Sequence, residues 1–530
     1  MRRLASVCPA IAAVLVAAVL ISACGGSAPK PRPAKQHAHR LAKRTALKVD
    51  YYVAQAASGL QDGSSCANAQ SVDWLNDPGT WGTASGQVGP GKVVGLCGTI
   101  TSGLTMQGSG TPGNPVTVYW EPHATLSSPA GTATVLTNGQ SYITLDGGTD
   151  GSIQATALGS ALPDHGHWAQ AIYALNCTGC TFRNLTIANF YRHTSATDTA
   201  VDATQSNAIR FSGSDITIAN NTIHDVGWAL YAQWNNGNRQ ITIRGNNIYN
   251  VDHGFASTSG FAGGSIGPIY VYGNNIHDFA NWDTTAGVYH HDGIHCYTVV
   301  SQPGASHYSG FYIYNNRFGG TAGQNTTSDI FLEGRYGQSG ATPCSDASSS
   351  VYIFNNVFTS TDEPTDNAYI SDSAGNGGIY NNTVAGKNNA ITRGGCAGYG
   401  AQPPGARVAF ENNVLTTCNN LIGGNPDAYA PGRLDHNVYA DGGNNSFVCG
   451  SSFYMFSQFA SWQSCMRADA HSVAVASAGL VDNGSPDRSS PANRMGKNLT
   501  DLCQGALVPL CSNIDGTPRP ASGPWAAGAY

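Results

Sequence analysis

Short runs of alternating apolar and polar residues recur along most of the chain, and each run passes through a pair of asparagines or a related pair. The runs have a period of two and are rich in Ile, Val, Tyr and Phe, which indicates strands rather than helices. One unit alone cannot bury its apolar face, whereas stacked units can. The pattern therefore predicts an all-β solenoid, a parallel β-helix. The clearest copies span Ile216–Ile223, Ile241–Ile248, Tyr270–Ile276, Tyr312–Phe318 and Tyr352–Phe358.

The asparagine corner returns at intervals of roughly thirty residues, the length that three short strands and their turns require. Two intervals are longer, from Asn275 to Asn316 and from Asn316 to Asn356. Coils stacked about 4.8 Å apart would align the corners, so that their amides hydrogen-bond from coil to coil.

The N-terminal residues predict export. Arg2 and Arg3 precede an apolar run over residues 11–21, which is too short for a membrane span. The ending Leu20–Cys24 resembles the lipobox of bacterial lipoproteins, which implies a signal peptide over 1–23 and a lipid on the Cys24 thiol. An ordinary signal peptide without an anchor is the alternative. Residues 24–48 are rich in Pro, Ala and basic residues and predict a disordered linker, so we expect an extracytoplasmic protein, membrane-anchored or secreted.

Composition limits the partners. The net charge is −6 and Lys is scarce after residue 48, so the chain has no basic stripe that could bind nucleic acid. We also expect the protein to be a monomer. The cysteines beyond Cys24 are even in number, as is usual outside the cytoplasm. Their spacing matches no zinc site, so no metal ligands are predicted and disulfides are expected. The local pairs are Cys66–Cys97, Cys177–Cys180, Cys296–Cys344, Cys396–Cys418, Cys449–Cys465 and Cys503–Cys511.

The C-terminal part carries a second pattern, with Phe459–Trp462, Ser490–Ala492, Asp515–Pro520 and Trp525–Tyr530. Together with the asparagine corners it resembles the bacterial secreted right-handed parallel β-helix family of the pectate-lyase-like superfamily, over nearly all of the mature chain. The resemblance implies a right-handed β-helix over 49–440, with an N-terminal cap that begins near Tyr51. It also implies closing coils and a cap over 441–530, in which Trp462, Arg519 and Trp525 are structural.

A second strand series lies between the corners, and its members align on their first apolar residue. Alternation then directs that residue inward and its neighbour outward. One outer face would carry acids, a histidine and aromatic rings as a shallow groove, a surface that suits a sugar polymer. The residues predicted on this face are Arg210, Tyr231, Gln233, His295, Tyr297, Glu333 and Asp372.

The densest chemistry is in His290–His295, which resembles the Asn-Thr-Asp-Gly-Ile-Asp strand of polygalacturonase-type glycosidases. The resemblance implies that Asp292 is a catalytic acid, with His295 in the place of the last acid. Independently, His295 and Glu333 come from neighbouring coils, where an imidazole and a carboxylate can exchange protons. We predict catalysis by these three residues, and substrate binding by the other groove residues together with His291 and Arg335, whose guanidinium suits a carboxylate.

These segments fall within the two longer intervals, where inserted loops often carry function. The leading prediction is a carbohydrate-active protein that cleaves a polysaccharide. A lyase would need a base and a group that neutralises a uronate, and Ca²⁺ held by Asp202, Asp252 or Asp283 is one possibility, as in uronate lyases of the superfamily. A hydrolase would need two carboxylates, Asp292 with Glu333 or Asp372. The alternative is a non-catalytic polysaccharide-binding or adhesin-like protein.

Overall fold

The computed structural model describes residues 47–128, 133–156, 169–190, 206–233, 238–259, 265–279, 291–298, 307–322, 326–332, 349–360, 368–372, 376–386, 395–399, 407–440 and 445–530. Lys48–Tyr530 forms one compact unit. The predicted signal peptide, Cys24 and nearly all of the predicted linker lie outside the described residues. Within them, we find no helix with the length and apolar character needed to cross a membrane.

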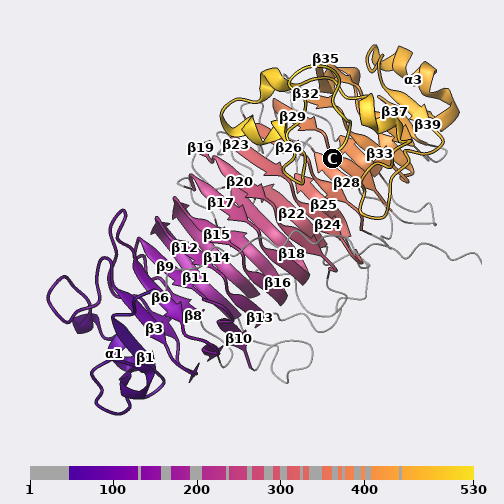
Figure 1. Ribbon diagram of the computed structural model, residues 1–530. Helices are drawn as coiled ribbons and strands as arrows, with labels where there is room; N and C mark the ends of the chain where they lie inside the picture. The colour runs from indigo at the N-terminus through magenta and orange to yellow at the C-terminus, as the bar shows by residue number, and fades with distance from the viewer. Residues whose placement is uncertain are drawn as a thin grey trace, which may run out of the picture. The chain divides into compact units, whose positions relative to one another are not determined.

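The predicted fold is confirmed: the unit is a right-handed parallel β-helix whose coils contribute strands to three columns (Figure 1). The first column precedes the asparagine corner. Its strands, in pairing order, are β2 (Gln70–Ser71), β1 (Tyr51–Ala54), β3 (Val93–Leu96), β6 (Val116–Trp120), β9 (Ile143–Asp146), β12 (Thr181–Arg183), β15 (Thr217–Ala219), β17 (Ile241–Arg244), β20 (Ile269–Tyr272), β23 (His307–Tyr314), β26 (Ser350–Phe354), β29 (Asn376–Tyr380), β32 (Val408–Glu411) and β35 (Tyr429–Asp435), with β19 (Ser265–Ile266) beside β23.

The second column follows the corner, and β16 and β18 continue from it into the third column. Its strands are β4 (Thr99–Ile100), β7 (Thr125–Ser128), β10 (Ser152–Ala155), β13 (Thr186–Phe190), β16 (Thr222–Ala232), β18 (Asn247–Ser259), β21 (Asn275–His277), β24 (Arg317–Gly319), β27 (Val357–Phe358), β30 (Thr383–Ala385), β33 (Val414–Thr416), β36 (Val438–Ala440) and β39 (Val473–Val475). The third column adds β5 (Leu104–Thr105), β8 (Ala133–Leu136), β11 (Ala169–Thr178), β14 (Ser206–Ser214), β22 (His291–Thr298), β25 (Thr326–Leu332), β28 (Ala368–Asp372), β31 (Gly395–Tyr399), β34 (Asn420–Ile422) and β37 (Phe447–Cys449), to which β38 (Ser452–Tyr454) pairs antiparallel.

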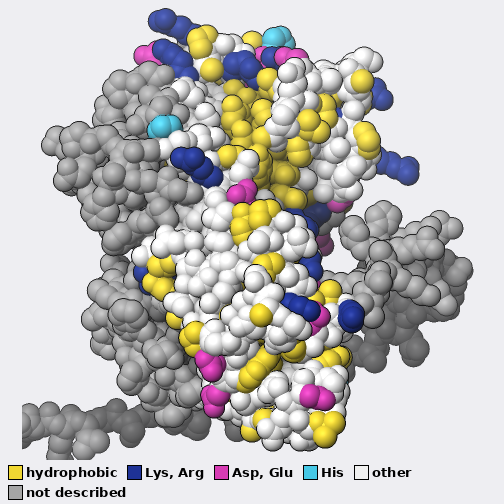
Figure 2. All heavy atoms as spheres, turned by 90° about the vertical axis from the view of Figure 1, so that its left-hand side faces the viewer, with side chains coloured by type: hydrophobic (Ala, Val, Ile, Leu, Met, Phe, Trp, Pro, Cys, Tyr) yellow, Lys and Arg dark blue, Asp and Glu magenta, His cyan; other side chains and the backbone are white. Residues whose placement is uncertain are grey.

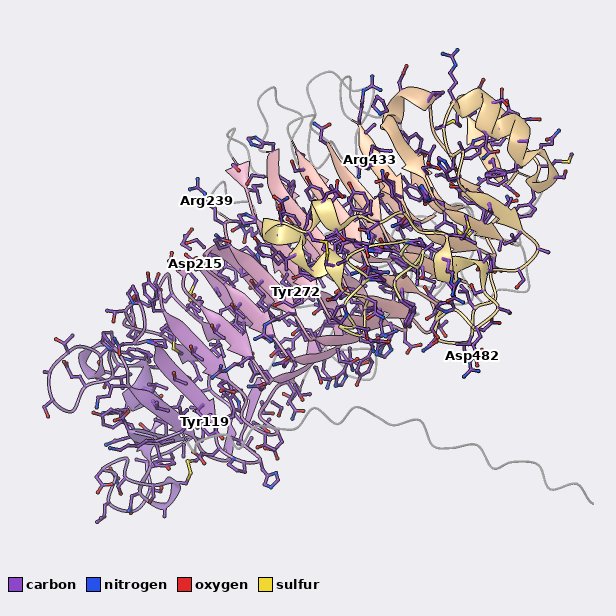
Figure 3. All side chains as sticks on the ribbon, turned by 45° about the horizontal axis from the view of Figure 1, so that its top comes forward. Tyr119, Asp215, Arg239, Tyr272, Arg433 and Asp482 are labelled. Atoms are coloured by element: carbon purple, nitrogen blue, oxygen red, sulfur yellow. A yellow bond between two sulfur atoms is a disulfide. The ribbon has the colours of Figure 1, made fainter. Side chains whose placement is uncertain are left out.

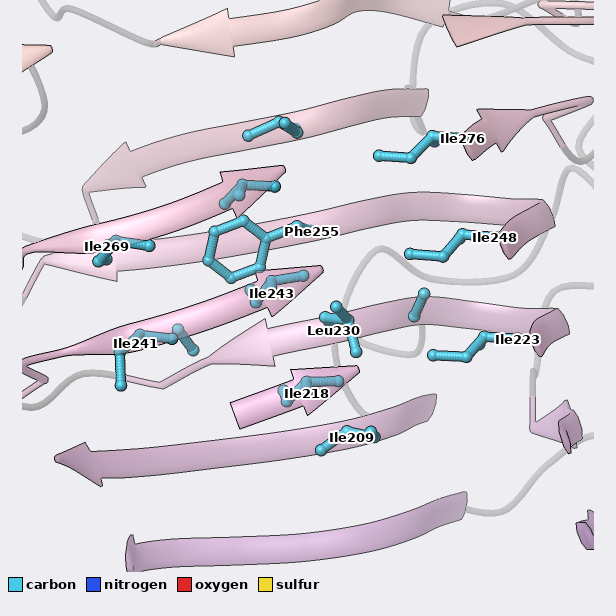
Figure 4. Packing of buried hydrophobic residues seen from close by; sticks show 14 of the residues in the cluster. Ile209, Ile218, Ile223, Leu230, Ile241, Ile243, Ile248, Phe255, Ile269 and Ile276 are labelled. Atoms are coloured by element: carbon cyan, nitrogen blue, oxygen red, sulfur yellow. The ribbon is translucent and has the colours of Figure 1, made fainter. Parts of the chain in front are cut away.

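Apolar ladders fill the interior. Phe182, Ile218, Ile243, Val271 and Ile313 occupy equivalent positions in successive strands of the first column and are buried. Apolar side chains of the second and third columns belong to the same buried cluster (Figure 4), among them Ile223, Ile248 and Ile276 of the second column and Ile209, Leu230 and Phe255 of the third. Each coil therefore buries its inward residues only because the coils above and below it are present.

The asparagine corners have two distinct positions. The first residue of each pair has a positive φ, as at Asn220, Asn315 and Asn355, and Gly245 and Gly273 take this position in two coils. Asn and Gly tolerate this left-handed conformation better than other residues. The second residue is a buried asparagine that hydrogen-bonds to the next coil, as predicted. This ladder comprises Asn221, Asn246, Asn274, Asn316, Asn356, Asn382, Asn413 and Asn437.

Helices are few among the described residues. The α-helix α1 (Val72–Asn76) packs into the core at the first coils, and α3 (Phe459–Met466) brings the buried Trp462 against Phe447 at the last. The 3-10 helices are η1 (Cys66–Asn68), η2 (Pro78–Thr80), η3 (Pro426–Ala428), η4 (Phe456–Gln458), η5 (Pro491–Arg494), η6 (Thr500–Leu502) and η7 (Gly505–Cys511).

Five of the six predicted disulfides are present: Cys66–Cys97, Cys177–Cys180, Cys396–Cys418, Cys449–Cys465 and Cys503–Cys511. Cys296 is also disulfide-bonded, and its predicted partner Cys344 lies outside the described residues. Disulfides of this number support a location outside the cytoplasm.

The end of the chain lies along the side of the β-helix rather than only across its last coil. Arg519 donates to the Asn355 side chain at 3.0 Å, and Trp525 is fully buried in a cluster with Tyr314 and Phe354. The half-buried Tyr272 packs against the same cluster (Figure 3). The structural role predicted for Arg519 and Trp525 is therefore lateral: they cover aromatic side chains on the outside of the first column.

The surface agrees with the low charge of the sequence. On the face shown in Figure 2, Lys and Arg side chains are scattered singly, and apolar side chains gather in its upper half.

Candidate active site

The predicted register of the third column is confirmed. Tyr173, Arg210, Tyr231, Ala256 and His295 occupy equivalent positions in β11, β14, β16, β18 and β22. Phe331 of β25 and Ser371 of β28 continue this series, which we call the outer ladder. The preceding residues of these strands, from Ile209 to Ile370, point into the core as expected.

A second ladder lies three residues before the outer ladder. Trp228, His253, Asp292 and Ser328 are equivalent in β16, β18, β22 and β25, which lie side by side in Figure 1. Trp228 packs with Tyr231 and Ala256 in a cluster separate from the core, with the two ring centroids 4.9 Å apart. Both ladders therefore face outward, and the two residues between them face inward.

The strands bend between the two ladders, where two successive residues face inward, and small residues make this bend possible. The inward pairs are Ala229–Leu230, Gly254–Phe255 and Gly293–Ile294. A Cβ on Gly254 would lie 2.4 Å from the Gly293 carbonyl oxygen, and one on Gly293 would lie 2.4 Å from the Asp329 carbonyl oxygen. Because a side chain does not fit there, glycine lets the backbone of one coil approach the next and leaves both flanking side chains outside.

The bend assembles a compact group that we call the His–Asp centre, formed by Asp252, His253, His291, Asp292 and His295. The Asp292 Oδ2 atom lies 3.3 Å from His253 Nε2 and 3.3 Å from His295 Nδ1. These two nitrogens are themselves 3.0 Å apart. A carboxylate oxygen and two imidazole nitrogens from neighbouring coils thus converge on one point.

Further contacts hold the two carboxylates of the centre in place. Asp252 Oδ1 lies 3.0 Å from His291 Nδ1 and 3.6 Å from His253 Nδ1, and Asp252 Oδ2 accepts the Trp228 indole N–H at 3.2 Å. Asp292 Oδ1 accepts the backbone N–H of Ser328 at 3.0 Å. Each carboxylate is therefore held at one oxygen by a donor that cannot titrate in the physiological range.

Charge is retained in this buried site. Burial lowers the pKa of His253, but Asp252 and Asp292 raise it further, to about 9. Burial likewise raises the pKa of Asp252, but His253 and His291 hold it well below its usual range. The two residues form a buried ion pair, in which each partner compensates the desolvation of the other.

The centre is more enclosed than the predicted shallow groove. Asp292 is fully buried, His291 is 1% exposed, and Tyr231 and His295 are only 4–5% exposed. Stacking along the ladder accounts for part of this burial, since the His295 ring stacks on Phe331 at 4.9 Å and on His253 at 5.2 Å. Alternation correctly directed these side chains outward, but it does not reveal that stacked rings shield one another.

Two other predicted groove residues form a polar patch further along the outer ladder. The Arg210 Nε donates to the Gln233 Oε1 at 2.7 Å. The Arg210 guanidinium also lies 5.6 Å from the centre of the Tyr173 ring and 5.3 Å from that of Tyr231. These cation–π contacts help to hold the guanidinium in place. At about 4.8 Å per coil, Arg210 lies three coils, or roughly 14 Å, from His295, and Gln233 lies two coils, or roughly 10 Å, from it.

The structure does not describe the side chains of four predicted site residues. Glu333 and Arg335 lie outside the described residues. Tyr297 and Asp372 belong to β22 and β28, but their side chains are not described.

The predicted calcium option does not fit the centre. Asp202 and Asp283 lie outside the described residues. Asp252 is surrounded by imidazole and indole nitrogens rather than by the oxygen ligands that Ca²⁺ requires.

Sequence reasoning missed Trp228 and His253 as site residues and considered Asp252 only for calcium. Counting alternation back from Phe255 places His253 inside, whereas the bend at Gly254 places it outside. The sequence signal that could have revealed the bend is a small residue directly before the aligned apolar residue: Ala229 before Leu230, Gly254 before Phe255 and Gly293 before Ile294.

Comparisons with known proteins add little beyond the fold. No protein-family model matches the chain, and no curated protein matches it. Among solved structures, the family 28 exopolygalacturonase of Yersinia enterocolitica is 12% identical, with a TM-score of 0.35 over 68% of this chain and 71% of that one. A surface adhesin of Streptococcus pneumoniae is 11% identical, with a TM-score of 0.37 over 75% and 95%. A rhamnogalacturonan lyase is 12% identical, with a TM-score of 0.36 over 68% and 87%. Such distant likenesses carry no argument about activity.

Proposed function

We propose that this protein works outside the cytoplasm, where it binds a polysaccharide and cleaves it at the His–Asp centre. The observation that carries the proposal is the convergence of Asp292, His253 and His295 within 3.3 Å on the outer side of the third column. A carboxylate held between two imidazoles is suited to proton transfer.

Two cleavage reactions fit this centre. In a lyase reaction, a base removes the proton beside a uronate carboxylate, the glycosidic C–O bond breaks with formation of a carbon–carbon double bond, and the leaving oxygen takes up a proton. In a hydrolase reaction, water attacks the anomeric carbon as the glycosidic C–O bond breaks, while one group accepts a proton from the water and another donates a proton to the leaving oxygen. Asp252 and Asp292 both belong to the centre, so two carboxylates are available, and Glu333 remains a predicted third. The products distinguish the two reactions.

Substrate binding is assigned to the surfaces that flank the centre. The patch of Arg210, Tyr231 and Gln233 offers a guanidinium and an amide on consecutive coils, and the nearly buried Tyr231 ring packs against the guanidinium. Sugar hydroxyls and carboxylates hydrogen-bond to guanidinium and amide groups. Tyr297, Arg335 and Asp372 keep their predicted role as further substrate contacts, and His291 acts through Asp252.

The test is to incubate the mature chain with a panel of pectins, alginates and neutral glycans. Ultraviolet absorbance of unsaturated products reports a lyase, and new reducing ends without that absorbance report a hydrolase. We expect Asp292→Asn and His295→Ala to lose turnover at least about 100-fold, the usual contribution of a proton-transfer group. His277→Ala is the matched control, because His277 pairs with Asp278 at 2.6 Å on the same β-helix but away from the centre. Equal turnover in all three variants would refute the assignment.

The enclosure of the centre favours one second candidate, a polysaccharide-binding or adhesin-like protein without catalysis. Asp292 and His295 are nearly inaccessible, as in a structural ion-pair network. Polysaccharide binding with no product from any member of the panel would select this candidate.

We also propose that the mature chain is a monomer tethered through a lipid on Cys24. Mass spectrometry of the membrane fraction tests the lipid, and Cys24→Ala should release the protein into the soluble fraction.

A further inference from the structure

We propose that His253, Asp292 and His295 bind a divalent transition-metal ion of the Zn²⁺ class. This inference deepens the proposed function, because it assigns a metal to the same centre, and its catalytic meaning rests on that function. Metal binding itself can be measured without any substrate.

The geometry of the three ligand atoms carries the proposal. His253 Nε2, His295 Nδ1 and Asp292 Oδ2 form a triangle with sides of 3.0, 3.3 and 3.3 Å. Tetrahedral zinc has ligands at about 2.0–2.1 Å, which places neighbouring ligand atoms about 3.3–3.4 Å apart. An ion about 2 Å from each of the three atoms would sit just outside the plane of the triangle.

The second group of histidines and an acid among the described residues lacks this geometry. In Asp435, His436 and His471, the His471 Nδ1 atom lies 2.6 Å from Asp435 Oδ2, which is much shorter than the spacing between neighbouring ligand atoms of tetrahedral zinc. His436 Nδ1 is engaged with the Met495 carbonyl, and the His471 side chain is 68% exposed. That group is a surface ion pair, and it provides an internal control.

The chemistry of the ligand set selects the ion. Two imidazole nitrogens and one carboxylate oxygen favour zinc and its first-row neighbours, whereas calcium and magnesium favour oxygen ligands. Three protein ligands leave a coordination position for water, as in catalytic zinc sites. Asp292 and His295 lie three residues apart in β22, but His253 comes from β18 in the neighbouring coil, so sequence spacing alone does not reveal the full set.

The surrounding contacts orient the ligands. The other nitrogen of His253 faces Asp252 at 3.6 Å, and Asp252 is held by the Trp228 indole. The other oxygen of Asp292 is fixed by the Ser328 backbone N–H. Carboxylates and backbone donors behind the ligands are what tune metal sites in proteins. The three ligands are at most 5% exposed, so the site would bind its ion in a nearly dry environment.

Such an ion would supply Lewis-acid chemistry and make a coordinated water more acidic, which suits polysaccharide cleavage. His253, Asp292 and His295 would then serve as the residues that hold the ion.

The experiment measures metal binding by the mature chain. Protein stripped with a chelator is titrated with Zn²⁺ by calorimetry, and Co²⁺ is used as a spectroscopic probe of tetrahedral coordination. We expect one tight site per chain, with at least about 100-fold weaker binding in His253→Ala, Asp292→Asn and His295→Ala. Asp252→Asn should weaken binding by about 10- to 100-fold. His471→Ala, in the control group, should leave the affinity unchanged.

Circular dichroism confirms that each variant is folded, and Asp252→Asn, which leaves all three ligands in place, keeps the test valid if a ligand variant unfolds. No Zn²⁺ binding, or binding that only His471→Ala abolishes, overturns the inference. Tight binding at the centre without polysaccharide cleavage supports the metal site and refutes the proposed function. Cleavage that persists after chelation supports the function and overturns the metal.

Discussion

At the scale of single residues, the candidate site depends on two glycines, because a larger side chain would not fit at their positions. Gly254 and Gly293 allow the backbones of adjacent coils to approach, and this approach brings His253 and Asp292 to the outside.

The ladder of buried asparagines ends at a single acidic residue, Asp469. Asn437, the last asparagine, donates to Asp469, which also accepts from Ser472. Asp469 is 1% exposed, so the last asparagine meets a carboxyl group that is nearly out of reach of water.

The buried Asp469 predicts a pH dependence of stability. Burial raises its pKa to about 6, against the partly opposing hydrogen bonds of Ser472, Tyr439 and Asn437. In the unfolded chain the group loses its proton near pH 4. Between these values the folded state binds more protons than the unfolded state, so stability falls as the pH rises from about 4 to about 6.

Asp469→Asn should remove this fall, which amounts to roughly 3 kcal/mol in the wild type. Urea unfolding between pH 4 and 7 measures it. Asp487→Asn, at an exposed carboxylate that accepts from Ser489, is the control and should keep the wild-type slope. A variant slope equal to that of the wild type would show that Asp469 ionises normally.

At the scale of the strand and its corner, the buried asparagine connects each coil to its neighbours on both sides. The Asn274 amide donates to Ile243 O at 3.1 Å and to Asn316 Oδ1 at 3.0 Å, and its own oxygen accepts from Asn246. Asn275, the next residue, is exposed and makes one side-chain bond, to Asn247.

Asn274→Ala should destabilise the protein by about 2–4 kcal/mol, because it leaves buried donors and acceptors in two coils without partners. Asn275→Ala removes a similar amide bond at the surface and should change stability by less than about 0.5 kcal/mol. Thermal and denaturant unfolding compare the two. Similar losses in both variants would show that the ladder adds nothing beyond local turn formation.

The same scale shows what sequence could and could not predict. Period-two alternation and the recurring corner determine register, so the alignment of Arg210, Tyr231 and His295 was predicted correctly. Alternation fails where two successive residues face inward, as at Gly254–Phe255, and the failure concealed His253. Distances such as that between His253 and Asp292 depend on ring orientation across two coils, which no local pattern encodes.

At the scale of the whole molecule, the C-terminal segment joins parts of the chain that are far apart in sequence. Asn381 and Asn412, both at positive-φ corner positions, donate to the carbonyl oxygens of Ala526 and Lys497. The C-terminal segment thus supplies hydrogen-bond partners to the outward asparagines of three consecutive corners, Asn355, Asn381 and Asn412. Its removal would expose the aromatic cluster of Tyr314, Phe354 and Trp525.

Arg519 should control whether this segment stays in place. Its guanidinium, 9% exposed, donates to Asn355 Oδ1 and to the carbonyl oxygens of Ala526, Gly528 and Tyr530. Burial lowers its pKa to about 10, so the group remains charged at neutral pH and depends on these acceptors. Arg519→Ala should therefore cost at least about 2 kcal/mol and loosen the segment.

Hydrogen exchange resolved by peptide distinguishes loosening from global unfolding. In Arg519→Ala we expect faster exchange in residues 490–530 and in the first-column strands β26 and β29, with the His–Asp centre unchanged. Arg488→Ala, at an exposed arginine, is the control and should exchange like the wild type. If exchange in Arg519→Ala accelerated equally in every coil, the segment would be an integral part of one cooperative unit, and the solenoid would not unfold coil by coil as nearest-neighbour stacking implies.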